Sequence, residues 1–165
     1  MTHAARILGI DPGLVSTGWG IIEAQGSRLS FVDCGTIGTQ AKDALHARLL
    51  TLSADLARII TLYRPTTAAI EETFVTQNGA STLKLGQARG ALIVTLAQHG
   101  LSVAEYATRS VKKALVGTGA AEKHQVSQMV GVLLPAAREA LAACKHDAAD
   151  ALAIAITHAH HASHR

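Results

Sequence analysis

Short apolar runs separated by turn residues open the chain. The run at residues 7–10 ends at Asp11 and is followed directly by Pro-Gly, a pattern typical of a buried strand before a turn. The stretches 17–23 and 29–35 follow, with a Gln-Gly-Ser turn between them. Three runs joined by turns in this way predict an antiparallel meander of three strands.

From residue 43 the apolar positions recur in steps of three and four as far as Tyr63, and Pro65 comes directly afterwards. This spacing predicts an amphipathic helix that ends before the proline. The small apolar run 68–70 then leads to Glu71 and predicts a fourth strand. A strand that follows a helix and an earlier strand implies a parallel neighbour reached by a crossover.

The second half of the chain is expected to be mainly helical. Residues 76–82 are polar and contain Asn-Gly, so we predict a loop before a helix over 83–99. Gly86 and Gly90 lie one turn apart in that helix. They either permit close packing of another helix or are simply tolerated at some cost in helix stability. The other expected elements are a strand over 101–106, helices over 108–116, 123–133 and 147–158, and a frayed, disordered tail over 158–165.

The composition narrows the class of protein. The 165 residues are 48% hydrophobic and 16% charged, which excludes a disordered chain and predicts one domain spanning 1–165. The net charge of +3 is compatible with a nucleic-acid partner without requiring one. Cys34 and Cys144 lack ligand-like spacing, which favours two reduced thiols. Without a secretory signal or a long apolar run, we expect a cytoplasmic protein with no membrane partner.

Acidic residues stand where the pattern favours apolar ones. Asp11 and Glu71 each close a predicted buried strand, and Asp147 and Asp150 share one face of an alanine-rich helix, roughly 60° apart. Each acid also has an ordinary explanation, as a turn former, a strand-end surface residue or a helix cap. Glu72 is expected on the opposite face from Glu71.

Four such carboxylates together point to a hard cation. Magnesium and manganese prefer oxygen ligands, whereas zinc is disfavoured because no paired Cys or His set accompanies the acids. Two such ions about 4 Å apart can activate a water and stabilise the departing oxygen of a phosphodiester. The implied reaction is metal-assisted hydrolysis of a nucleic-acid backbone.

Several motifs together resemble the bacterial RuvC family over residues 6–158. They are GIDPG followed by TGWG, then AIEETF, KLGQARG, VKKALVGTGAAEKHQV and HDAADALAIAITH. The resemblance implies an α/β, ribonuclease-H-like fold: a five-stranded mixed sheet, three strands antiparallel and then parallel, flanked by helices. It implies a Holliday junction resolvase whose Asp11, Glu71, Asp147 and Asp150 hold two Mg²⁺ ions, with Mn²⁺ as a substitute.

The same resemblance implies partners and DNA contacts. It implies a homodimer that nicks opposing strands of a four-way junction symmetrically, leaves 5′-phosphates, and works with the RuvA and RuvB branch-migration proteins. Lys112 and Lys123 match family lysines beside the acids, and Phe74 matches a residue that stacks on an unstacked base. Further expected DNA contacts are Thr76, Gln77, Asn78, Lys84, Arg89, Arg109 and Lys113.

The chain departs from the family pattern in two places, and alternative functions remain. Glu72 adds a carboxylate where relatives often have an uncharged polar residue, and the His-rich tail has no evident family role.

The basic residues at 109–123 are alternatively a solvated helix face. A phosphotransferase of the actin and sugar-kinase type needs two such domains, for which 165 residues are too few. A DNA-binding module with non-catalytic acids stays open.

Overall fold

A mixed five-stranded sheet lies at the centre of the protein. The computed structural model describes residues 4–72, 77–144 and 146–162. The strand order is β3-β2-β1-β4-β5. β1 pairs antiparallel with β2, and β2 with β3, whereas β4 runs parallel to both β1 and β5. The strands are β1 (Ala5–Asp11), β2 (Ser16–Gln25), β3 (Arg28–Gly38), β4 (Thr67–Glu71) and β5 (Val103–Tyr106). The predicted fold class is confirmed.

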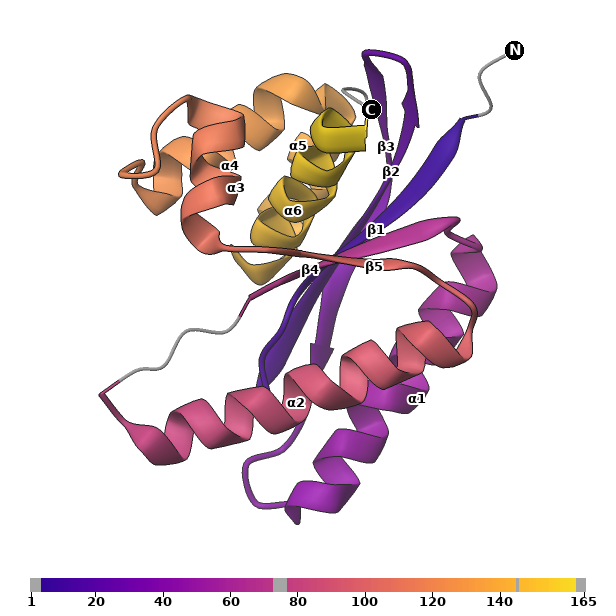
Figure 1. Ribbon diagram of the computed structural model, residues 1–165, viewed down its shortest axis with the longest axis vertical. Coiled ribbons are helices and arrows are strands. Elements are labelled where there is room, and N and C mark those ends of the chain that lie inside the picture. Colours follow the sequence, from indigo (N-terminus) through magenta and orange to yellow (C-terminus); the bar gives the residue numbers. More distant parts are fainter. Residues whose placement is uncertain (1–3, 73–76, 145, 163–165) are drawn as a thin grey trace.

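Helices cover both faces of this sheet (Figure 1). α1 and α2 lie on one face, over a core that includes Leu8, Leu56 and Leu92. α6 lies on the other face with the shorter helices around it, over a core that includes Ile7 and Leu152. The helical elements are α1 (Leu45–Tyr63), α2 (Gly79–Gln98), α3 (Thr108–Val116), α4 (Lys123–Leu133), the 3₁₀ turn Pro135–Ala137, α5 (Arg138–Ala143) and α6 (His146–Ala162).

Glycines on the sheet let the backbone of α6 approach β1 and β2 closely. A Cβ atom at Gly18 would lie 2.0 Å from the carbonyl oxygen of Asp147, and one at Gly9 would lie 2.1 Å from that of Ala151. A side chain at either position would therefore push the helix away from the sheet. The small residues of α6 complete this contact, since Ala148, Ala151 and Ala155 are fully buried.

The largest differences from the predicted boundaries are at the start of α2 and the end of α6. α2 begins at Gly79, inside the predicted 76–82 loop, because the Asn78 side chain caps the helix by accepting a hydrogen bond from the Ser81 backbone N–H at 3.1 Å. At the other end, α6 continues to Ala162 instead of fraying after His158. The imidazole of His158 explains the extension, since it hydrogen-bonds the hydroxyls of Tyr106 at 2.9 Å and Thr67 at 3.2 Å.

Neither α1 nor α2, the two longest described helices, combines the length and apolarity needed to span a bilayer, and the same holds for the other described helices.

The two cysteines are both free, and Cys144 Sγ lies 3.9 Å from the carbonyl oxygen of Cys34. The fold therefore brings together two thiols that are far apart in the sequence.

Candidate active site

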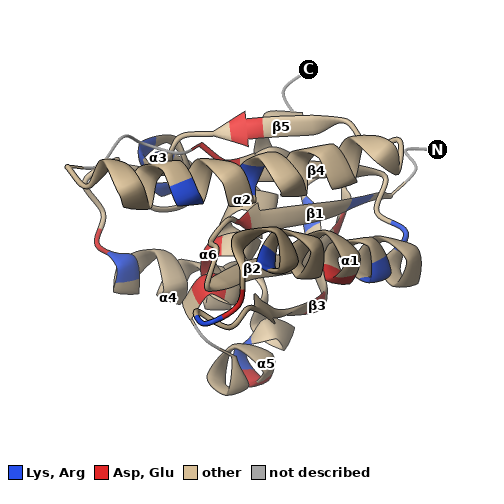
Figure 2. Ribbon diagram, turned by 90° about the horizontal axis from the view of Figure 1, so that it is seen from below, with Lys and Arg blue, Asp and Glu red and all other residues tan. Residues whose placement is uncertain are grey.

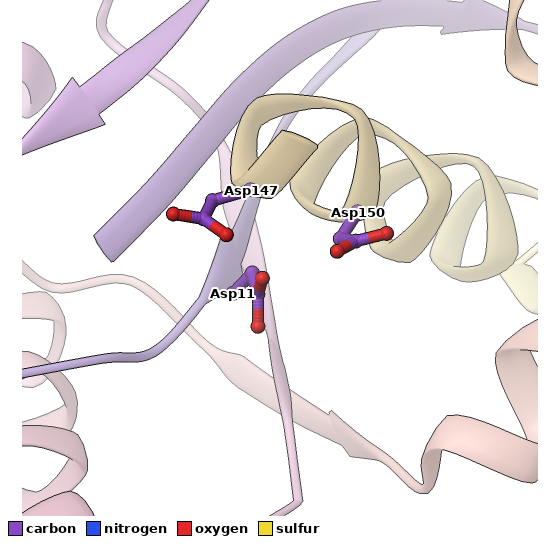
Figure 3. A group of neighbouring side chains, drawn as sticks. All are labelled: Asp11, Asp147 and Asp150. Carbon is purple, nitrogen blue, oxygen red and sulfur yellow. The ribbon is translucent and has the colours of Figure 1, made fainter. Parts of the chain in front are cut away.

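Three of the four predicted acids converge at one end of the sheet. Asp11 ends β1, and α6 crosses that strand so that Asp147 and Asp150 project from its first turns toward it (Figure 3). One carboxylate oxygen from each residue lies within 4.8 Å of the other two. The residues come from opposite ends of the chain, so the close contact between α6 and the sheet is what forms the cluster.

Glu71 joins this cluster from the neighbouring strand. β4 runs parallel to β1, and Ile10 pairs with Ile70. Asp11 and Glu71 therefore lie side by side at the carboxyl ends of two adjacent strands. The carboxyl group of Glu71 lies close enough to that of Asp11 for its charge to raise the pKa of Asp11. Glu72 is exposed, as its alternation with Glu71 predicts, and its backbone N–H donates to the carbonyl of Tyr106.

Burial and the neighbouring acids disfavour the ionisation of Asp11. Burial, followed by the charges of Glu71 and Asp150, raises the pKa of Asp11 from 3.8 to about 8. Such an arrangement is unfavourable for a protein without a compensating positive charge. Carboxylate oxygens at this spacing are the ligands that hard divalent cations take, so the donor set fits such an ion.

One lysine supplies part of the compensating charge. Lys123, the first residue of α4, places its Nζ 2.8 Å from Asp150 Oδ2, and this hydrogen bond raises the pKa of Lys123. Asp11, Glu71, Asp150 and this lysine border a hollow of about 330 Å³. Its lining residues are Asp11, Glu71, Thr108, Val111, Lys112, Lys123, Val126, Asp150, Ala153 and Ile154.

Two hydroxyl groups contact the acids, and the sequence pattern indicates neither of them. Ser16 Oγ donates a hydrogen bond to Asp147 Oδ2 at 2.6 Å, and Thr108 Oγ1 donates one to Glu71 Oε1 at 2.6 Å. Neither residue stands out in the sequence, because Ser at a strand start and Thr at a helix start are ordinary choices. Only the folded arrangement reveals their partners.

The predicted basic DNA contacts lie beside the hollow, on two short helices. Lys112 is half-buried, and Arg109 and Lys113 are exposed on α3, which leads through Gly117 toward α4. Figure 2 shows basic residues on α3 and at the start of α4, with further ones on α2. A second hollow of about 450 Å³ lies next to the first and is lined by Thr108, Arg109, Lys112, Gly119 and Ala120.

The other predicted DNA contacts fall near the start of α2. Gln77 and Lys84 are exposed, and Asn78 caps the helix. Arg89 is already engaged, because its Nε donates to the carbonyl of Glu71 at 2.9 Å and its guanidinium pairs with Glu105, which indicates a structural role. Phe74 and Thr76 lie outside the described residues.

Comparison with known proteins places the chain in a family. The model of the family described as Crossover junction endodeoxyribonuclease RuvC matches residues 7–158. The chain belongs to the RuvC family. It is 56% identical over 156 residues to crossover junction endodeoxyribonuclease RuvC of Azorhizobium caulinodans, which covers 94% of this chain and 90% of the relative. The corresponding protein of Acidiphilium cryptum is 56% identical over 161 residues, covering 98% and 94%.

Solved structures agree with membership of the RuvC family. The structure of Thermus thermophilus RuvC in complex with a Holliday junction substrate has 31% sequence identity and a TM-score of 0.88, covering 97% of this chain and 96% of the other. The yeast mitochondrial Holliday junction resolvase Ydc2 has 13% identity and a TM-score of 0.69 over 94% and 78% of the two chains, and so shares the fold. For a RuvC-family nuclease, the clustered acids indicate a divalent metal ion.

Proposed function

We propose that this protein is a structure-selective endonuclease that resolves Holliday junctions in recombination and DNA repair, by metal-dependent phosphodiester hydrolysis that leaves 5′-phosphates. The observation that carries the proposal is the convergence of Asp11, Asp147 and Asp150 beside Glu71, next to a hollow that Lys123 also lines. Membership of the RuvC family and the likeness to a RuvC bound to a Holliday junction support the choice of substrate.

Asp11, Glu71, Asp147 and Asp150 would hold the metal, which we propose to be two Mg²⁺ ions replaceable by Mn²⁺. The bound ions would supply activation of a water and stabilisation of the departing oxygen. The lysines act on the phosphate itself. Lys123 and Lys112 both line the hollow, where their ammonium groups stabilise the negative charge that develops on the phosphate oxygens.

DNA would lie over the hollow and the basic residues around it. Arg109, Lys112 and Lys113 supply phosphate contacts on one side, and Lys84 supplies one from α2. Gln77 and Asn78 lie directly before α2 and would assist DNA binding from there. By the family resemblance, Phe74 stacks on an unpaired base and Thr76 assists it.

We further propose that residues 1–165 act as one nuclease domain that forms a homodimer through α2. Within the described chain, no atom lies within 4 Å of where a Cβ of Gly86 or Gly90 would be, so this stripe faces outward. Leu83 and Val94 on the same helix are 64% and 54% exposed. A second copy would cover these apolar positions. RuvA and RuvB would be its partners, in the cytoplasm.

The test uses a synthetic four-way junction, a linear duplex of the same sequence, and Mg²⁺. Wild type should nick the junction symmetrically and leave the duplex intact, whereas Asp11→Asn should bind the junction and leave it uncut. Gly38→Ala is a matched control, because nothing lies closer than 4.0 Å to the added methyl group. Tight junction binding by wild type without nicking would instead support a binding module. Equal cleavage of the duplex would indicate a general nuclease.

A further inference from the structure

Two of the acids are held by hydroxyl groups from other parts of the chain. Thr108 Oγ1 reaches Glu71 Oε1 across 37 positions of sequence, and Ser16 Oγ reaches Asp147 Oδ2 across 131, both at 2.6 Å. Each hydroxyl donates to one carboxylate oxygen.

Local structure does not account for the two contacts. Thr108 is the first helical residue of α3, one position after the N-cap Ala107, so its hydroxyl does not occupy the capping position. The neighbouring Thr17 shows the usual local alternative, since its hydroxyl donates to the carbonyl of Gly13 four residues earlier. The hydroxyls of Ser16 and Thr108 are directed instead at distant acids.

The contact at Glu71 has the greater consequence for a metal site. Glutamate has three side-chain torsions to restrict, whereas aspartate has two, so an unrestrained Glu71 loses more conformational entropy when it coordinates an ion. The backbone of Glu71 is already held by Arg89, through the hydrogen bond to its carbonyl. Threonine is stiff at its first torsion angle, so Thr108 offers a donor in a fixed direction.

We propose that Thr108 and Ser16 are positioning residues, which hold Glu71 and Asp147 in the orientations that bind the divalent cation. The proposal rests on the metal-dependent function proposed above. Partners of this kind fix the orientation of metal-binding side chains, and their loss typically weakens metal binding by about 10- to 100-fold. Because each hydroxyl is bonded to an acid, we expect its loss to change metal affinity before it changes the chemistry.

The experiment measures Mn²⁺ binding by calorimetry and by electron paramagnetic resonance, without DNA, and then cleavage as a function of Mg²⁺ concentration. Thr108→Val removes the donor at constant shape, and Thr108→Ser retains it. Thr51→Val is the matched control, since Thr51 is exposed on α1 and its hydroxyl donates to the carbonyl of Ala47 in the same helix. Ser16→Ala tests the second contact.

Thr108→Val should bind Mn²⁺ about 10-fold more weakly or worse, and Thr108→Ser should recover most of that loss. Its cleavage should need more Mg²⁺ for half-saturation, while junction affinity measured in EDTA stays at the wild-type value. Ser16→Ala should shift Mn²⁺ binding in the same direction, and Thr51→Val should shift nothing. Wild-type Mn²⁺ affinity in Thr108→Val, with a wild-type melting curve, would overturn the positioning role. Failure of wild type itself to bind Mn²⁺ would overturn the metal site instead.

Discussion

The close contact between α6 and the sheet can be tested by adding a single methyl group at Gly18. In Gly18→Ala the new Cβ would lie 2.0 Å from the carbonyl oxygen of Asp147, 2.3 Å from its carbonyl carbon and 2.9 Å from its Cβ. All three atoms belong to the start of the helix that carries two of the acids. Gly18 has no positive φ, so the alanine is compatible with the strand and only this contact is disturbed.

The size of the effect follows from that distance. To restore even 3.0 Å between the new Cβ and the oxygen, β2 and the start of α6 must separate by about 1 Å. Overpacking of this kind costs about 1–3 kcal/mol in the free energy of unfolding. A displacement of about 1 Å at a reacting centre can cost about 100-fold in rate. We therefore expect a folded protein with cleavage reduced by about two orders of magnitude.

Three measurements on Gly18→Ala separate these effects. Thermal unfolding reports the loss of stability, calorimetry reports Mn²⁺ affinity, and single-turnover cleavage of a four-way junction reports the chemistry. Gly38→Ala is the control, since its added methyl group meets nothing closer than 4.0 Å. If Gly18→Ala cleaves within threefold of wild type while Gly38→Ala is also unaffected, the tight seat of α6 does not position the acids, and the reasoning fails.

Further predictions concern three titratable or charged groups. Because the pKa of Asp11 is about 8 in the folded protein and 3.8 unfolded, the metal-free folded state binds more protons between these values. Its free energy of unfolding should fall as pH rises from about 4 to about 8, and Asp11→Asn should remove most of the slope in urea titrations. Lys123→Met should bind Mn²⁺ at least as tightly as wild type but cleave about 100-fold more slowly; weaker Mn²⁺ binding would assign Lys123 to ordering the acids. Burial raises the pKa of Cys34 to about 12, so in the native protein mass spectrometry should find iodoacetamide on Cys144 long before Cys34, with the difference lost in urea.

Sequence reasoning located the acids because a carboxylate at the end of a buried strand is conspicuous. Asp11 and Glu71 each interrupt an apolar run, and the crossover between them implies adjacent parallel strands. Spacing alone leaves open whether the acids of α6 meet those of the strands. The structure shows that α6 packs closely on the glycines of the sheet and so places Asp147 and Asp150 next to Asp11. The role of each acid in catalysis stays a prediction, as do those of Phe74 and the basic residues.

The features that were missed depend on contacts between distant segments. The partners of Ser16 and Thr108 lie 131 and 37 positions away, beyond any local pattern. The tail was predicted to fray because its histidines look solvated, yet His158 is held by hydroxyls from β4 and β5. The Asn-Gly pair was interpreted as a turn, whereas Asn78 caps α2. In each case a tertiary or capping hydrogen bond decided between two locally acceptable structures.

The division of the acids between the two ends of the chain also affects biosynthesis. A nascent chain that stops before His146 contains Asp11 and Glu71 but neither acid of α6, and the sheet surface around Gly9 and Gly18 stays uncovered. Partial translation products and C-terminally clipped fragments should therefore be unable to nick DNA. The proposed nuclease site is therefore complete only after α6 has been synthesised and has folded onto the sheet.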